Sequence, residues 1–126
     1  MIKTELTLRL QNSPGTLARV CDVLAADGVN VSALMLDPSG AMRFIVDNPT
    51  HAAGVLRERN YQVTERPVLF VQLGNRAGSF AAVARMLSAA GINLDYVYAT
   101  APDNQPHAAI VIGVPDAMRA AAAAGV

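Results

Sequence analysis

The sequence predicts an α+β fold built from two copies of one structural element, and three observations carry this prediction. First, the 126 residues are 52% hydrophobic and 16% charged, which gives enough apolar side chain for the core of one domain or of two small ones. Second, the sequence matches itself at an offset of 63 residues. Third, each copy contains segments with strand periodicity and segments with helix periodicity.

The internal repeat gives ten identities over the 31 positions from 5 to 35. Other positions keep their chemical character, as where Thr16 matches Ser79. A duplicated unit keeps such a pattern because each copy must bury the same face. The identical pairs are Leu6 and Leu69, Leu10 and Leu73, Asn12 and Asn75, Gly15 and Gly78, Ala18 and Ala81, Val20 and Val83, Leu24 and Leu87, Ala26 and Ala89, Gly28 and Gly91, and Asn30 and Asn93.

Each copy begins with a strand that runs into a turn. Apolar and polar residues alternate over positions 6–10, and the apolar positions recur over 69–73, which is the period of a half-buried strand. Asn-Ser-Pro-Gly at 12–15 and Asn-Arg-Ala-Gly at 75–78 then have the composition of turns. The strand of each copy therefore ends before a short loop.

A helix with one apolar face follows each loop. Thr16 and Ser79 have side chains that cap helices, so we expect the helices to begin there. Apolar residues fall at i, i+3, i+4 and i+7 from Leu17 and again from Phe80. Each helix is expected to end at a glycine, which takes the left-handed conformation without strain, at Gly28 and Gly91.

The rest of each copy reads as two further strands and a second helix. The expected second strands are 29–36 and 92–99, and the third strands are 42–46 and 108–113. A compact turn at 37–40 joins them in the first copy, and a longer hairpin at 101–106 joins them in the second. The second helices are expected from Asn48-Pro49 to about residue 60 and over 116–124, with a fourth strand at 61–64 before Pro67 in the first copy.

This order of elements predicts two ferredoxin-like βαββαβ units, over residues 1–66 and 67–126, each an antiparallel sheet with its helices on one face. The second unit lacks residues for a last strand, so the edge at 68–73 is expected to be bare. Because bare edges pair readily, we predict that a strand of the other copy or of another chain covers it, unless the chain is truncated. The alanines at 120–124 favour a helix and are expected to bury little surface.

Composition and charge exclude several classes of function. Ten basic and ten acidic residues give a net charge of zero, which argues against nucleic-acid binding and against a polybasic membrane patch. The single cysteine, Cys21, excludes an internal disulfide, a thiolate zinc cluster and a CxxC pair. The start of the chain is charged, and no apolar run approaches about 18 residues. We therefore expect a soluble, cytoplasmic protein.

No group of residues has the spacing of a catalytic or metal site, so no enzyme, metal or cofactor is expected. His51 and His107 have no ligand partners at suitable spacing and are expected on the surface. Cys21 is predicted to be a small buried hydrophobic residue. Tyr96 and Tyr98 share one face of a strand and are expected to pack in the core or on the sheet, with a pocket or a subunit contact as the alternative.

The repeated loop and helix pattern resembles the ACT domain, a ligand-sensing module of amino-acid metabolism. The resemblance rests on Asn-x-Pro-Gly-Thr-Leu from residue 12, on Asp-Gly-Val-Asn-Val from residue 27, and on their counterparts in the second copy. It covers nearly the whole chain and is similar to small free-standing proteins with two ACT units. It implies a non-catalytic regulator that binds a free amino acid where two ACT units meet, as a homodimer or with an enzyme of amino-acid metabolism as partner.

The resemblance also implies which residues contact the ligand. Asn30 and Asn93 correspond to the asparagine that reaches the ligand of a neighbouring unit. An amino acid needs donors for its carboxylate and acceptors for its ammonium, and an asparagine amide supplies both. Backbone N–H groups at a helix start favour the carboxylate. The implied ligand loops are Asn12, Ser13, Pro14, Gly15, Thr16 and Leu17, and Asn75, Arg76, Ala77, Gly78, Ser79 and Phe80.

Two readings stay open at this point. Asn12 and Asn75 also fit an Asx-type turn, in which the side chain stabilises the loop and contacts no ligand. The whole protein also fits a ligand-free interaction module that pairs through an exposed sheet edge. Some serine-binding members of the family carry histidine where this chain has Leu10 and Leu73, so serine is not implied, and Ala77 in place of the loop proline makes the two loops unequal.

Overall fold

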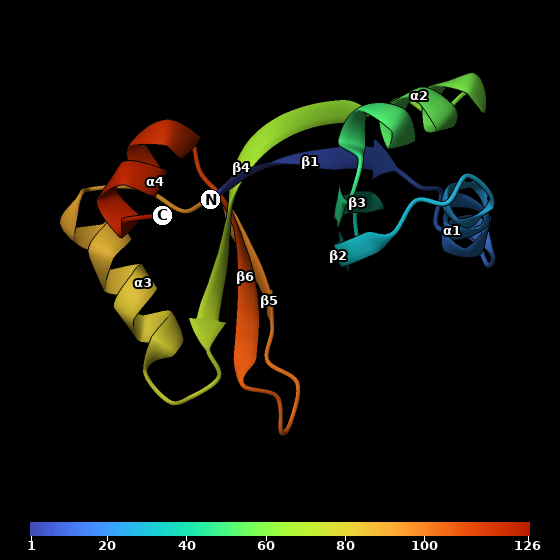
Figure 1. Cartoon of the computed structure of the whole chain (residues 1–126). Helices are drawn as coiled ribbons and strands as arrows, with labels where there is room; N and C mark the ends of the chain where they lie inside the picture. The colour runs from blue at the N-terminus through green and yellow to red at the C-terminus, as the bar shows by residue number, and fades with distance from the viewer. The chain divides into compact units, whose positions relative to one another are not determined.

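The computed structural model describes residues 1–126 and has the predicted α+β fold (Figure 1). Contacts divide the chain into an N-terminal unit, Thr4–Arg66, and a C-terminal unit, which joins Met1–Lys3 to Pro67–Val126. The elements are β1 (Ile2–Arg9), α1 (Thr16–Ala26), β2 (Val31–Leu36), β3 (Ala41–Val46), α2 (Pro49–Glu58), β4 (Thr64–Gly74), α3 (Ser79–Ala89), β5 (Tyr96–Thr100), β6 (His107–Gly113) and α4 (Ala117–Ala124).

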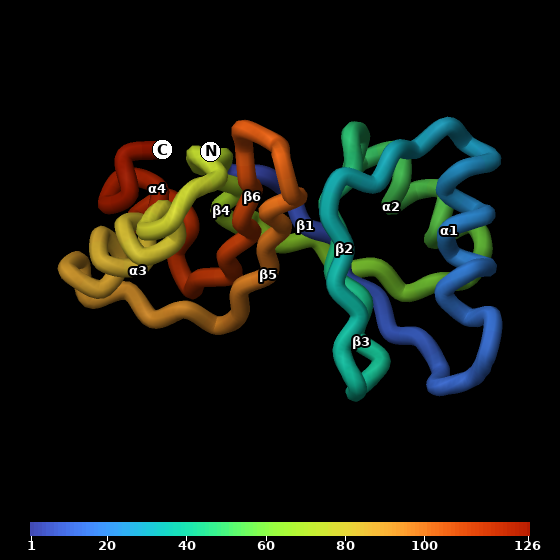
Figure 2. Tube along the Cα trace, turned by 90° about the horizontal axis from the view of Figure 1, so that it is seen from below, coloured from blue at the N-terminus to red at the C-terminus, as the bar shows by residue number.

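In the N-terminal unit, β3 lies between β2 and β1, and both pairings are antiparallel. Phe44 of β3 stands opposite Leu6 of β1 and Leu34 of β2. The start of β4 lies on the other side of β1, where the Thr64 hydroxyl donates to Thr7 O at 3.5 Å. Helices α1 and α2 pack side by side on one face of this sheet (Figure 2), and their apolar faces close a core around Phe44.

The C-terminal unit repeats this arrangement, with β6 between β4 and β5. Ile112 of β6 stands opposite Leu69 of β4 and Val97 of β5. Helices α3 and α4 lie together on one face of the sheet (Figure 2). Leu69, Leu87 and Ile112 are buried together in the core of this unit. No helix of the chain is both long enough and apolar enough to cross a membrane.

The first residues of the chain occupy the edge of β4 that the sequence predicts to be bare. The Met1 ammonium donates to Phe70 O at 2.9 Å, and Phe70 N donates to Met1 O at 2.8 Å. Lys3 Nζ lies 4.1 Å from the centroid of the Phe70 ring, a cation–π contact that holds the same segment in place. The C-terminal unit therefore takes its fourth strand from the first residues of β1, which continue into the N-terminal unit.

Three expectations about the strands and the last helix are wrong. The first copy has no separate strand at 61–64, because β4 runs without a break from Thr64 through Pro67 to Gly74. The second strand of the second copy begins at Tyr96 rather than at residue 92. The alanines of α4, which were expected to bury little surface, contribute to the core, since Ala120 is 0% and Ala121 6% exposed.

The helix ends follow the sequence except at the N-terminal caps of α1 and α3. Gly28 and Gly91 have φ near +69° after α1 and α3, as predicted, and Asn48 caps α2 through His51 N. The predicted caps Thr16 and Ser79 are wrong, because Gly15 and Gly78 hold the N-cap positions and neither helix has a side-chain cap. A left-handed glycine, with φ of +86° at Gly15, turns the loop into the helix instead.

Candidate functional site

The first loop lines a cavity of about 430 Å³ in the N-terminal unit. Asn12, Ser13 and Gly15 line it from the loop, and Thr16 and Leu17 line it from the start of α1. Pro14 is part of the loop but does not line the cavity. The opposite wall comes from the end of β2 and the turn after it, and the full lining is Leu10, Gln11, Asn12, Ser13, Gly15, Thr16, Leu17, Leu36, Asp37, Pro38 and Gly40.

Strand pairing brings the two walls of this cavity together. Arg9 at the end of β1 stands opposite Ala41 at the start of β3. Leu10 N then donates to Gly40 O at 2.8 Å, which joins the first residue after β1 to the turn between β2 and β3. The loop that begins at Gln11 and the turn that ends at Gly40 therefore leave the sheet at the same end, with the cavity between them.

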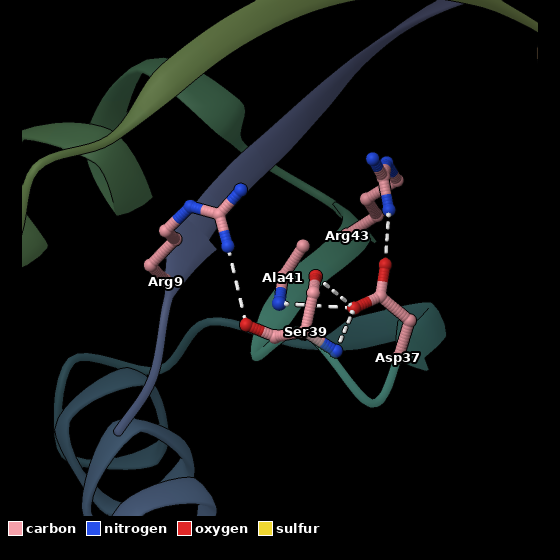
Figure 3. Close-up of polar contacts among 5 residues, drawn as sticks. All are labelled: Arg9, Asp37, Ser39, Ala41 and Arg43. Carbon is pink, nitrogen blue, oxygen red and sulfur yellow. Dashed lines mark hydrogen bonds and ion pairs between the residues drawn. The ribbon is translucent and has the colours of Figure 1, made fainter. Parts of the chain in front are cut away.

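The turn wall is held by the Asp37 carboxylate (Figure 3). Asp37 Oδ1 accepts from Ser39 N at 2.9 Å, from Ala41 N at 3.3 Å and from the Ser39 hydroxyl. Asp37 Oδ2 accepts from Arg43 Nη1 at 3.1 Å, and Arg9 Nη1 donates to Ser39 O at 3.2 Å. The Ser39 hydroxyl, followed by Arg43 and the two backbone N–H groups, lowers the pKa of Asp37 from 3.8 to about 2 against a smaller opposing effect of desolvation.

This carboxylate makes the stability of the protein depend on pH in acid. Because the folded state has the lower pKa, Asp37 contributes stability that is fully present above about pH 4 and is lost as the pH falls toward 2. The variant Asp37→Asn is expected to show a smaller fall in the thermal midpoint between pH 4 and pH 2 than the unchanged protein. Asp103→Asn, in the exposed hairpin of the C-terminal unit, is the control. Equal slopes for all three proteins would contradict the assignment.

The loop wall offers hydrogen-bond donors and a free carboxamide. Helix α1 has no side-chain cap. Thr16 N donates to Ser13 O at 3.5 Å and Arg19 N donates to Gly15 O at 3.0 Å, so the Leu17 and Ala18 N–H groups between them have no partner in the helix. Arg19 Nη1 comes within 3.6 Å of the position that a Cβ on Gly15 would take. The Asn12 side chain makes no hydrogen bond within the chain. This wall has donors for an anion and both donor and acceptor atoms on Asn12.

The second loop differs from the first in how its asparagine is used. Asn75 Nδ2 donates to Pro102 O at 2.8 Å and to Gln105 O at 2.9 Å, so this carboxamide ties the β5–β6 hairpin. The Arg76 guanidinium folds back to within 2.7 Å of the position of a Cβ on Gly74. Ala77, Gly78 and Ser79 lead into α3 as in the first copy, and Phe80 is 40% exposed.

Asn30 and Asn93 lie away from the loop of their own unit. Asn30 precedes β2, at the end of that strand opposite to Leu36, and its N–H donates to Asp47 Oδ1 at 3.1 Å. Asn93 lines a smaller cavity of about 190 Å³ with Asp116 and Arg119. Neither asparagine lines the 430 Å³ cavity.

The remaining cysteine, histidine and tyrosine residues lie outside the cavity. Cys21 is half-buried and not part of the core, so the prediction of a buried cysteine is wrong. His51 and His107 are exposed as predicted, and His51 Nε2 lies 3.3 Å from Asp27 O. Tyr96 and Tyr98 are half-buried with their rings stacked at 6.4 Å. No three His, Cys, Asp or Glu side chains cluster as a metal site.

Sequence reasoning missed the cavity wall formed by Leu36, Asp37, Pro38 and Gly40. The sequence predicts the turn at 37–40 but not its position beside the first loop. The predicted topology contains the information that locates this wall. In a ferredoxin-like unit the third strand pairs with the first, so the turn before the third strand lies at the end of the first strand. The alternation in the sequence predicts Leu10 only as a strand residue, although its N–H is the group that joins the two walls.

Comparison with known families identifies the class of this chain. The family model of the ACT domain pair matches residues 1–120, so the chain belongs to this family. No protein with curated annotation matches it.

Solved structures share this fold over nearly the whole chain. A Bacteroides thetaiotaomicron protein superposes with a TM-score of 0.89 and 29% identity, over 98% of this chain and 86% of its own. The ligand-free regulatory subunit of aspartate kinase from Thermus thermophilus has a TM-score of 0.70 and 18% identity, over 99% and 92%. The regulatory subunit of aspartate kinase from Thermus flavus gives 0.68 and 18%, over 99% and 94%.

Proposed function

We propose that this protein is a non-catalytic regulator that binds a free amino acid in the 430 Å³ cavity of the N-terminal unit. The observation that carries the proposal is that free backbone donors at the start of α1 and the free carboxamide of Asn12 lie on the same wall of the cavity. The donors suit an α-carboxylate, and the carboxamide oxygen suits an α-ammonium. Membership of the ACT domain pair family supports the same role.

Regulation requires that the ligand favours one arrangement of its surroundings over another. We propose that Asn30 or Asn93 of a facing unit, as in a homodimer, completes the contacts to the bound amino acid. Differential affinity for the closed arrangement then converts binding into a change that a partner enzyme can sense. The aspartate kinase regulatory subunits, which share the fold, support an enzyme of amino-acid metabolism as that partner.

The two loops are proposed to differ in function. Asn12 is free to contact a ligand, whereas Asn75 is committed to two carbonyl groups of the hairpin. Asn75 thus holds a distant hairpin and does not form the local Asx turn that the sequence also allows, whereas Asn12 is proposed to contact the ligand. One amino acid per chain is the expected stoichiometry.

A thermal-shift screen with the twenty amino acids tests this proposal. A matching ligand at about 100 times its Kd is expected to stabilise the protein by about 2.7 kcal/mol. Asn12→Ala is expected to abolish the shift, because it removes the free carboxamide. Asn75→Ala, at the equivalent position of the repeat, is the matched control. Its thermal midpoint without ligand is expected to be lower than that of the unchanged protein, but the ligand is expected to raise it by the same amount.

The outcomes separate the proposal from its alternative. A shift that survives in Asn12→Ala would remove this asparagine from the site. No shift with any amino acid at millimolar concentration would favour the ligand-free interaction module. Because Met1 pairs with Phe70 on β4, that alternative would have to use another edge strand, β2 or β5.

A further inference from the structure

The cavity at the first loop has almost no charge of its own. Of the residues that line it, Asp37 alone carries a charge at neutral pH. Both oxygens of this carboxylate are already occupied, by Ser39, Ala41 and Arg43. The one nearby cation, Arg19, lies beside Gly15, where the ligand's own α-carboxylate is proposed to bind. A charged ligand side chain would therefore gain no further partner of opposite sign in the cavity.

Apolar side chains form the rest of the walls. Leu10 is 8% exposed and Leu17 packs against the core of the N-terminal unit, so both are fixed in place. Leu36 is 42% exposed at the end of β2, and Pro38 follows it in the turn. An aliphatic side chain of the ligand placed over Leu36 would remove apolar surface of both groups from water, which is favourable.

Most of the polar groups of the cavity lie on the loop wall, whereas Leu36 and Pro38 lie on the opposite wall, at the end of β2 and in the turn after it. The free N–H groups of Leu17 and Ala18, with Arg19 beside Gly15, suit the ligand's carboxylate. The ligand's own side chain is then left with the leucine and proline surface. No lining lysine, arginine, histidine or glutamate competes for it.

We propose that this cavity selects amino acids with uncharged aliphatic side chains, of the size of valine, isoleucine and leucine, and rejects acidic and basic ones. The inference rests on the proposed function, because it assumes that the cavity binds an amino acid at all. Each buried methylene group changes Kd by about fourfold. Valine, isoleucine or leucine is therefore expected to bind at least about tenfold more tightly than alanine, with aspartate and lysine weaker than alanine.

Isothermal titration of the full chain with valine, leucine, alanine, aspartate and lysine tests this selection. Leu36→Ser is expected to raise the Kd of leucine about tenfold and that of alanine less than about twofold, because only the aliphatic side chain reaches this wall. Leu34→Ser is the matched control, since Leu34 is 37% exposed two residues earlier on β2 and does not line the cavity. It is expected to change neither Kd.

The results distinguish failure of the selection from failure of the proposed function. If no amino acid binds the unchanged protein, the proposed function is overturned, and the selection with it. If aspartate or lysine binds more tightly than valine and leucine, the selection is wrong while the function stands. An equal loss for alanine and leucine in Leu36→Ser would also overturn the selection. Leu36→Lys is a second variant, expected to improve aspartate binding relative to leucine.

Discussion

Gly40→Ala is expected to destabilise the protein by about 3 kcal/mol. Gly40 has φ of +90°, a conformation that costs an alanine about 1–2 kcal/mol. A Cβ at this position would lie 2.3 Å from Leu10 O, which is backbone and cannot turn aside. Relief of the clash requires that β1 and the turn move apart, and this stretches the hydrogen bond from Leu10 N to Gly40 O. Urea unfolding measures the loss.

A second glycine provides the control for this variant. Gly54 lies inside α2, is exposed, and has nothing within 4 Å of the position of a Cβ. Gly54→Ala is therefore expected to stabilise the protein by about 0.5–1 kcal/mol, since alanine is the better helix former. The two alanine variants should thus change stability in opposite directions. A Gly40→Ala protein as stable as the unchanged one would show that the turn is not held as described.

The second large effect is expected in the two cores. Leu24 of α1 and Leu87 of α3 are equivalent in the repeat, and each is 1% exposed. Leu24→Ala and Leu87→Ala each remove buried apolar surface and leave a cavity that the neighbouring side chains fill only in part. We expect each to lower the free energy of unfolding by about 3 kcal/mol. Denaturant unfolding followed by circular dichroism gives both values.

Two outcomes would contradict this pair of predictions. Met118→Ala is the control, because Met118 is 77% exposed and its loss should change stability by less than about 0.5 kcal/mol. A loss below about 1 kcal/mol at Leu24 or Leu87 would mean that the site relaxes around the missing side chain. A strong loss at one leucine only would show that the equivalent positions are not equally packed.

Much of the fold could be predicted from the sequence because its signals are local. The alternation in β1, the apolar face of α1 and the glycine after it each depend on residues within one element. The repeat then doubled every signal, so that a weak pattern in one copy was supported by the other. Elements without such a local signal were placed less well, as with β5, whose start at Tyr96 is set by pairing with Gly113.

Only the loop wall of the cavity could be predicted, because one continuous segment of sequence forms it. The first loop was found because its residues are consecutive, whereas the wall at Asp37 depends on the pairing of Arg9 with Ala41. The use of Asn75 was also hidden, since its partners Pro102 and Gln105 lie in a hairpin with no local link to it. Such long-range contacts are fixed by tertiary structure and leave no spacing in the sequence.

The pairing of Met1 with Phe70 has a consequence for how such a protein can evolve. A single strand, β1, serves the C-terminal unit with its first residues and the N-terminal unit with the rest. After the ancestral duplication, neither half could be lost or exchanged as a module without leaving an open strand edge in the other. The two halves are therefore inherited together, while their loops are free to diverge. Asn12 and Asn75 illustrate this, since the Asn75 carboxamide bonds to the hairpin and that of Asn12 makes no hydrogen bond within the chain.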